Sequence, residues 1–278
     1  MTAREFRQVD VFTAEPYRGN PVAVVLDGDD LSDDEMAAFA RWTNLSETTF
    51  VTTPTSSDAD YRLRIFTPGR ELPFAGHPTL GSAHAWLEAG NRPRGGAAVV
   101  QECGVGLVRL RRDGDRIAFA APSLLRSGPG APEIQADAAR ALRIDPDAVR
   151  ACEWIDNGPG WLGVLLDSAD AVLAIEPDFA AFGDLKIGVV GPYPDGAPCA
   201  YEVRAFVPSL GVGEDPVTGS LNAGIGQWLI GAGIAPEQYV ASQGTRLQRA
   251  GRVHVDLEGS QVWVGGVSTT CIAGHVEL

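Results

Sequence analysis

Short apolar runs, many of them alternating with polar residues, dominate the first 120 residues and predict strands more often than helices. Turn-forming Gly, Pro, Asn and Asp residues separate the runs, as is typical of successive strands in one sheet. The predicted strands cover residues 4–12, 20–27, 46–53, 60–67, 97–102, 106–111 and 116–120. The first part of the chain is therefore expected to be a sheet with few helices.

Two helices interrupt these strands. Ser32 and Glu35 form a capping box, which predicts a helix that continues to about Trp42. Pro78 suits the first position of a second helix, and Gly90 suits its end. The residues between are rich in Ala, Gly and Ser, with no polar face. A helix with small residues nearly all round is expected to be enclosed by sheet on most sides.

The chain contains an internal repeat. The stretch YRLRIFTPGRELPFAGHPTLG at 61–81 returns as YEVRAFVPSLGVGEDPVTGSLNAG at 201–224, first at an offset of 140 residues and then of 143. Upstream, NPVAVVLD at 20–27 resembles GWLGVLLD at 160–167, again at an offset of 140. A repeat this long indicates a duplicated domain, because solenoid repeats are only ~20–50 residues long.

The second half is predicted to repeat the elements of the first. The proline- and glycine-rich stretch 121–133 is interpreted as the linker between the halves. Its predicted strands cover 162–166, 186–190, 201–207, 246–248, 252–257 and 261–264. Its predicted helices cover about 133–142, 178–182 and 220–231.

Composition narrows the classes of partner. The net charge of −14 and the pI of about 4.6 disfavour nucleic acid and anionic membranes as partners. No apolar run approaches the ~18 residues of a membrane span, and the first residues lack the apolar core of a signal peptide, so a cytoplasmic protein is expected. The four cysteines are far apart and are interpreted as reduced thiols, with neither disulfides nor a metal site expected: Cys103, Cys152, Cys199 and Cys271.

The repeated stretch places a glycine and a polar residue where each of two helices should begin: Gly76 with His77, and Gly219 with Ser220. Read locally, each pair is a helix cap. Because two copies exist, two helix N-termini could face one cleft between the halves and bind a small carboxylate with their free amides. Asp215 precedes a proline and could be a turn residue, and Glu47 on a short strand could be a solvated carboxylate.

Three motifs together resemble the PhzF (phenazine biosynthesis) family: NLSETTF at 44–50, ELPFAGHPTLG at 71–81 and GEDPVTGS at 213–220. The opening VDVFTAEPYRGNPVAVV also looks like that of the family, so the resemblance covers nearly the whole chain. It implies an α+β, diaminopimelate epimerase-like fold, with two pseudo-symmetric halves that each wrap a curved sheet or barrel around a central helix. The expected halves are 1–120, completed by a returning C-terminal strand at 268–278, and 122–266.

The resemblance also implies the site, because the motifs match position by position. It makes Glu47 the catalytic acid and base, with His77 beside it and Asp215 as a further catalytic residue. Gly76, Gly219 and Ser220 are the implied substrate-binding residues. No cofactor and no metal are expected. The related epimerases use two cysteines at the helix starts, where this chain has glycines.

The implied function is a cofactor-independent isomerase of a small unsaturated or cyclic amino or hydroxy acid. One carboxyl group can take a proton from one carbon and return it at another. The expected substrate is trans-2,3-dihydro-3-hydroxyanthranilate or a related carboxylic acid, in secondary metabolism such as phenazine or other antibiotic biosynthesis, and the resemblance suggests a homodimer. An amino-acid epimerase and a non-catalytic binding protein on the same fold remain alternatives.

Overall fold

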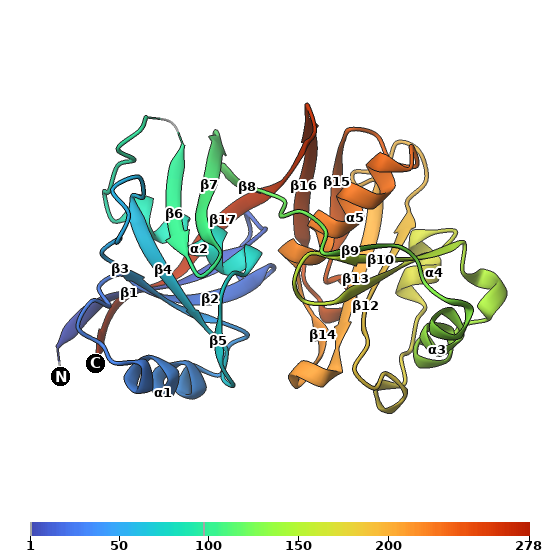
Figure 1. The fold of residues 1–278 in the computed structure, drawn as a ribbon, viewed down its shortest axis with the longest axis horizontal. Coiled ribbons are helices and arrows are strands. Elements are labelled where there is room, and N and C mark those ends of the chain that lie inside the picture. The colour runs from blue at the N-terminus through green and yellow to red at the C-terminus, as the bar shows by residue number, and fades with distance from the viewer. Residues whose placement is uncertain (1, 97) are drawn as a thin grey trace. The chain divides into compact units, whose positions relative to one another are not determined.

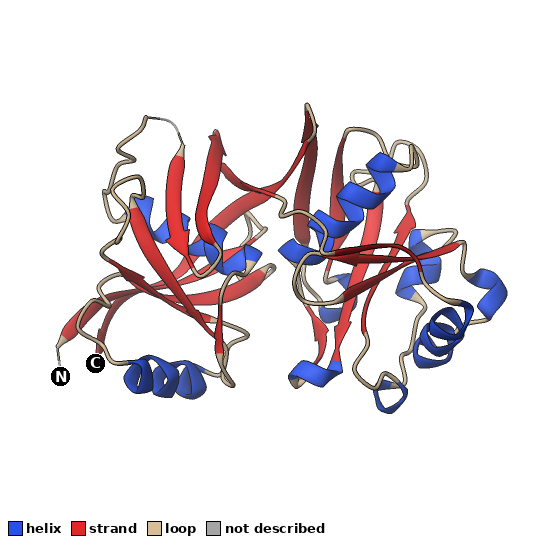
Figure 2. Cartoon of the chain, in the orientation of Figure 1, coloured by secondary structure: helices blue, strands red, loops and turns tan. Residues whose placement is uncertain are grey.

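The computed structural model describes residues 2–96 and 98–278. It divides into two compact units. Unit 1 runs to Ala120 and includes Gly265–Leu278 at the C-terminus. Unit 2 is the continuous segment Ala121–Val264. Both consist mainly of strands with few helices (Figure 2), as the α+β prediction requires.

In unit 1, curved strands surround one helix, α2, which packs against β1, β2, β3, β4 and β8 (Figure 1). A second helix, α1, covers the outside through an apolar cluster that includes Met36, Phe39 and Phe50. The elements of unit 1 are β1 (Ala3–Val11), β2 (Asn20–Val25), α1 (Asp33–Thr43), β3 (Thr48–Thr52), β4 (Tyr61–Phe66), β5 (Glu71–Leu72), α2 (Gly76–Glu88), β6 (Val99–Cys103), β7 (Gly106–Asp113), β8 (Arg116–Ala120) and the end of β17 (Gln261–Glu277).

Unit 2 has the same plan around helix α5, which packs against β10, β11 and β16. Helices α3 and α4 cover its outside through a cluster that includes Leu142, Val172 and Phe206. Its helices and strands are β9 (Arg126–Pro129), α3 (Pro132–Leu142), β10 (Ala151–Asp156), β11 (Trp161–Leu165), α4 (Ala169–Leu173), β12 (Lys186–Pro192), β13 (Tyr201–Val207), β14 (Val212–Asp215), α5 (Gly219–Gly231), β15 (Gln238–Gln243) and β16 (Gly251–Glu258).

Strand pairing repeats between the units in the register that the sequence repeat predicts. In unit 1, β4 pairs in parallel with β6, and Tyr61 lies opposite Gln101. In unit 2, β13 pairs in parallel with β15, and Tyr201 lies opposite Ala241, so both positions are shifted by 140 residues. The central helices α2 and α5 are each 13 residues long and begin 143 residues apart. The predicted duplication is thus present in the fold.

An arginine–glutamate pair also occurs in both copies and holds the short hairpin that leads to each central helix. In unit 1, Arg64 donates two hydrogen bonds of 2.7 Å to Glu71, joining β4 to β5. In unit 2, Arg204 donates bonds of 3.0 and 2.8 Å to Glu214, joining β13 to β14. The copies differ in burial, because the Arg204 and Glu214 side chains are 4% and 8% exposed and those of Arg64 and Glu71 are 17% and 42% exposed.

Glycines let the central helices approach the surrounding strands. A Cβ atom on Gly81 in α2 would lie 2.4 Å from Val22 Cγ1, and one on Gly224 in α5 would lie 2.6 Å from the carbonyl oxygen of Ile155. Both distances are shorter than any normal contact, so a side chain at either position would push the helix away from the sheet. Ten of the 13 residues of α2 are buried, which confirms the prediction of an enclosed helix.

The capping box at Ser32 and Glu35 is present at the start of α1, but several other predicted boundaries were wrong. Residues 245–247 form one 3₁₀ turn, η4 (Thr245–Leu247), and the strand predicted at 246–248 is instead β15, a few residues earlier. The predicted helix at 178–182 is the 3₁₀ turn η2 (Phe179–Ala181). The proposed linker contains β9, which pairs with β10. Strand β6 begins at Val99, and Ala97 in the predicted strand 97–102 lies outside the described residues.

The chain ends lie together in unit 1 (Figure 1), because β17 pairs antiparallel with β1 from Ala3–Glu277 to Val11–Ser268. Strand β17 begins at Gln261 in unit 2 and ends at Glu277 in unit 1. In the part of the chain that the structure describes, no helix has the length and apolar character needed to cross a membrane.

Candidate functional site

In unit 1, Glu47 and His77 are adjacent although 30 residues separate them in the sequence. Asn44, with a left-handed backbone (φ 54°), ends α1, and the chain then turns into β3, which begins one residue after Glu47. His77 is the second residue of α2, whose cap residue is Ala75. Oε2 of Glu47 lies 3.3 Å from Nε2 of His77, and the two side chains are 15% and 6% exposed.

Burial keeps the imidazole of His77 neutral at neutral pH. Loss of water around the ring lowers the pKa of His77 from its ordinary value of 6.5 to about 3, and a hydrogen bond to the backbone of Pro21 acts in the opposite direction. The contact with Glu47 has the geometry of an ion pair, but a neutral imidazole makes it a contact between one ionisable carboxyl group and an uncharged ring. Asn20, fully buried at the start of β2, places Nδ2 3.4 Å from Nδ1 of His77.

In unit 2, Asp215 and Ser220 lie on either side of the start of α5. Asp215 is the last residue of β14, which the Arg204–Glu214 pair holds, and its carboxylate accepts a hydrogen bond from the hydroxyl of Thr218. Ser220 is the second residue of α5. Its Oγ accepts a hydrogen bond of 3.0 Å from the indole N–H of Trp161. Because an indole is only a donor, the hydroxyl of Ser220 keeps its own proton to donate to a ligand.

Two details of the helix starts correct the sequence interpretation. His77 and Ser220 each occupy the second helical position, and the cap residues are Ala75 and Thr218. Pro78 is the third residue of α2, where the first was expected. Gly76 and Gly219 open the helices, so the free amides of the first turn belong to these glycines and the residues that follow. Glu47 precedes its strand, although it was expected on the strand.

Sequence reasoning missed four polar residues that support these groups. Asn20 lies beside His77, and Trp161 donates to Ser220. Gln243 and Asn222 are fully buried and hydrogen-bond around the cap residue of α5. Of these four residues, only Asn20 had a sequence feature that could have indicated a role in the site, because it is an amide directly before a proline in the opening motif. Gln243 had none, because it lies where no strand was predicted.

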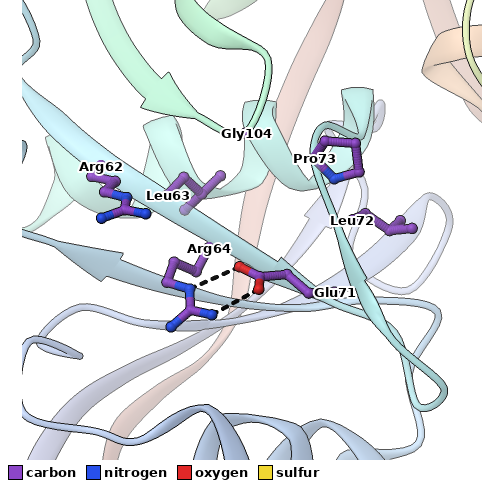
Figure 3. A pocket seen from close by; sticks show the side chains of 7 residues that line it. All are labelled: Arg62, Leu63, Arg64, Glu71, Leu72, Pro73 and Gly104. Atoms are coloured by element: carbon purple, nitrogen blue, oxygen red, sulfur yellow. Dashed lines mark hydrogen bonds and ion pairs between the residues drawn. The ribbon is translucent and has the colours of Figure 1, made fainter.

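A pocket of about 330 Å³ opens in unit 1 between β4, β5 and the turn from β6 to β7 (Figure 3). None of the predicted site residues lines it; the lining residues are Arg62, Leu63, Arg64, Glu71, Leu72, Pro73 and Gly104. Arg64 is one of its two cations, and Glu71 and Asp33 already neutralise its guanidinium, with the Asp33 contact at 2.6 Å. Arg64 is therefore poorly placed to bind an anionic substrate in this pocket.

The structure brings the predicted residues together in two groups, Glu47 with His77 and Gly76 in unit 1, and Asp215 with Gly219 and Ser220 in unit 2. Over residues 2–96 and 98–278, no cluster of three or more His, Cys, Asp or Glu side chains is placed to hold a metal ion. The four cysteines form no disulfide. Each group offers proton transfer or hydrogen bonding to a small polar molecule.

Comparison with known proteins identifies the family. A model of the PhzC-PhzF family, described as phenazine biosynthesis-like proteins, matches residues 9–274. The chain belongs to the PhzF family. A relative named trans-2,3-dihydro-3-hydroxyanthranilate isomerase, from Pseudomonas aeruginosa, is 36% identical over 94% of this chain and 93% of its own length. Members of the PhzF family are isomerases, and this chain is a PhzF-like isomerase.

Another relative has a name that states no reaction. Antisense-enhancing sequence 1 of Schizosaccharomyces pombe is 40% identical over 99% of both chains. Among solved structures, a PhzF family protein of Enterococcus faecalis has a TM-score of 0.82 and 26% identity over the full length of both chains. A hydroxyproline epimerase of Agrobacterium vitis, with a TM-score of 0.61 and 13% identity over 99% of this chain and 92% of its own, shares the fold alone. The predicted epimerase-like fold is confirmed.

Proposed function

We propose that this PhzF protein isomerises a small unsaturated or cyclic amino or hydroxy acid without a cofactor, and that Glu47 transfers the proton. The substrate is trans-2,3-dihydro-3-hydroxyanthranilate or a closely related acid, in line with the relative of that name at 36% identity. The observation that carries the proposal is the contact of 3.3 Å between Glu47, which is 15% exposed, and His77, whose burial keeps it neutral.

The reaction moves one proton and one double bond and leaves the composition of the substrate unchanged. The carboxylate of Glu47 takes a proton from an activated C–H group, and the electron pair of that bond shifts the neighbouring double bond. The protonated carboxyl group then returns the proton to the carbon at the far end of the shifted system. A neutral His77 suits both steps, since an imidazolium would hold the carboxylate in its ionised form.

The residues of unit 2 are proposed to hold the substrate. The hydroxyl of Ser220, whose oxygen already accepts from Trp161, donates its proton to the substrate carboxylate. The free amides at the start of α5 favour the same negative charge. The carboxylate of Asp215 accepts from the amino or hydroxyl group of the substrate. Gly76 supplies the corresponding backbone amide of unit 1, and the expected cleft between the two helix starts stays a prediction.

The test uses trans-2,3-dihydro-3-hydroxyanthranilate in D₂O, with the products followed by mass spectrometry and NMR. Turnover should shift a double bond and place at most one deuterium on the carbon that receives the proton. Glu47→Gln should lower kcat by roughly 10²–10⁴-fold, the usual contribution of general acid–base catalysis. Glu237→Gln, at an exposed position before β15, serves as the matched control and should keep wild-type activity.

Other outcomes would contradict the proposal in different ways. Deuterium at a stereocentre without a shifted double bond would indicate an epimerase. Binding without turnover, unchanged by Glu47→Gln, would indicate a non-catalytic binding protein. We further propose that the protein acts as a homodimer in the cytoplasm, within secondary metabolism. Sedimentation equilibrium would measure the oligomeric state, and a monomer at micromolar concentration would exclude the dimer.

A further inference from the structure

Behind Asp215, a chain of buried polar residues connects β15 to the start of α5. Gln243 and Asn222 are 0% exposed, and Thr218 is 8% exposed. The side chain of Gln243 makes four contacts within 3.2 Å, with the backbone and hydroxyl of Thr218, with Asn222 and with the backbone of Asp215. A buried glutamine so fully bonded restricts the conformations of its neighbours.

Two backbone groups determine which way the amide of Gln243 points. Its Oε1 accepts from the backbone N–H of Thr218 at 3.0 Å, and that group can only donate. Its Nε2 donates to the backbone carbonyl of Asp215 at 3.2 Å, and that group can only accept. The flipped amide would place donor against donor and acceptor against acceptor. Asn222 supports the same orientation, because its Nδ2 donates to Oε1 of Gln243 at 2.8 Å.

The orientation of Gln243 in turn determines the proton of Thr218. Nε2 of Gln243 also donates to Oγ1 of Thr218 at 3.0 Å. The hydroxyl therefore accepts from Gln243 and has one proton to donate, and its contact with Oδ2 of Asp215 shows where that proton goes. The donors are thus fixed along the chain of hydrogen bonds: the backbone N–H of Thr218 donates to Gln243, Gln243 donates to the hydroxyl of Thr218, and that hydroxyl donates to Asp215. One oxygen of the Asp215 carboxylate is held in place by the hydroxyl of Thr218.

We propose that Gln243 and Thr218 are positioning residues for Asp215: Gln243 orients the Thr218 hydroxyl, and the hydroxyl holds the Asp215 carboxylate toward the substrate. The inference deepens the proposed function and rests on it for the role of Asp215. Neither residue needs to touch the substrate, since both act through the carboxylate.

Gln243 also has a purely structural role at the helix start, because it accepts from the backbone N–H of the cap residue. The decisive variant is therefore Thr218→Val, which removes the hydroxyl, keeps the shape of the side chain and leaves the backbone bond to Gln243 intact. Thr218→Ser restores the hydroxyl. Thr79→Val is the matched control, because Thr79 is a buried hydroxyl near the start of α2 that accepts from Gln101 Nε2 at 3.1 Å.

The first measurement needs no activity. Crystal structures of the unliganded variants should show the Asp215 carboxylate turned from its wild-type rotamer in Thr218→Val, and in the wild-type rotamer in Thr218→Ser and Thr79→Val. An unchanged rotamer in Thr218→Val would overturn the proposal, whether or not the protein turns over the acid. This arm therefore separates failure of the inference from failure of the proposed function.

The second measurement follows kcat and KM on trans-2,3-dihydro-3-hydroxyanthranilate. Thr218→Val should lower kcat/KM about tenfold, with a raised KM, because a hydrogen bond to a charged group is lost. Thr218→Ser should recover most of the lost kcat/KM. In an Asp215→Asn background, Thr218→Val should lower kcat/KM by less than about a further twofold, because both substitutions interrupt the same chain of hydrogen bonds. A full additional tenfold loss there would mean that Thr218 acts on the substrate itself and would overturn the positioning role.

Discussion

At the level of single residues, the fold of this PhzF protein gives His77 and Asp215 different surroundings. His77 loses its water and becomes uncharged at neutral pH. Asp215 keeps partial access to solvent and receives a hydroxyl donor that suits a carboxylate. The carboxyl group beside a neutral ring suits the proposed proton transfer, and the carboxylate held by a hydroxyl donor suits the proposed substrate binding.

The buried His77 should make folding stability depend on pH. Its pKa is about 3 in the folded protein and about 6.5 when unfolded, so the unfolded chain binds the extra proton between these values. Stability should therefore be highest above pH 6.5 and fall as the pH drops toward 3, by roughly 1.4 kcal/mol per pH unit for this group. Urea unfolding of wild type and His77→Asn from pH 7 to 4 measures the difference. If the unfolding free energies of both proteins changed in parallel with pH, the predicted contribution of His77 would be contradicted.

The proposed roles also order the kinetic effects of three substitutions. Glu47→Gln should lower kcat most, since proton transfer occurs only in the transition state. Asp215→Asn should act partly through KM, because its role is to hold the substrate in both states. His77→Ala should lie between them. Steady-state kinetics on the same acid decide the order, and a near wild-type kcat in Glu47→Gln would refute the proton-transfer role.

At the level of elements, each central helix begins where a short hairpin ends, and an arginine–glutamate pair holds each hairpin. Arg204 donates to Glu214 and also to the carbonyls of Val172 and Ile175 at 3.2 and 2.7 Å, so it joins β13, β14 and the end of α4. Because β14 ends at Asp215, this pair sets the backbone from which that carboxylate extends.

The duplication provides a matched comparison of a buried and an exposed ion pair. Glu214→Gln should cost about 3–5 kcal/mol of unfolding free energy, because it leaves the buried Arg204 charge uncompensated. Glu71→Gln, at the equivalent and more exposed pair, should cost about 1 kcal/mol or less, since Asp33 also contacts Arg64. Chemical denaturation of the two variants measures both values. Equal losses would show that burial does not decide the strength of these pairs.

At the level of the whole molecule, one strand belongs to both units. Strand β17 begins in unit 2 and pairs with β1 in unit 1, so unit 1 is assembled from both ends of the chain. Its other neighbour in unit 1 is β8. The folding of unit 1 therefore depends on residues that are synthesised last, whereas unit 2 is continuous.

Removal of residues 268–278 should unfold unit 1 selectively. The truncation removes every partner of β1 in β17, from Glu277 to Ser268, and uncovers a long strand edge. Hydrogen exchange should show lost protection in β1 and β2 and retained protection in β10 to β13. The matched control is Ile272→Thr, a change at a residue that is 50% exposed in β17, which should preserve protection in both units. Retained protection in β1 of the truncated chain would contradict the prediction.

The sequence by itself determined the class of fold, the repeat, the enclosed central helices and the capping box of α1. These follow from local or periodic patterns, such as Ser32 with Glu35 three residues later, or a helix without a polar face around Gly81. The motifs of the PhzF family named Glu47, His77 and Asp215 for the same reason: the signal lies in the order of the residues along the chain.

Only the tertiary structure decided the chemical state of those residues and the identity of their supports. The uncharged state of His77 depends on burial by segments remote in sequence, and Gln243 supports Thr218 because β15 packs beside the start of α5. The strand ending at Gln243 was misplaced because QYVASQ lacks a clear apolar period, and its polar side chains are buried where partners satisfy them. Such burial is a property of the assembled fold, since the partners meet only when distant segments pack together.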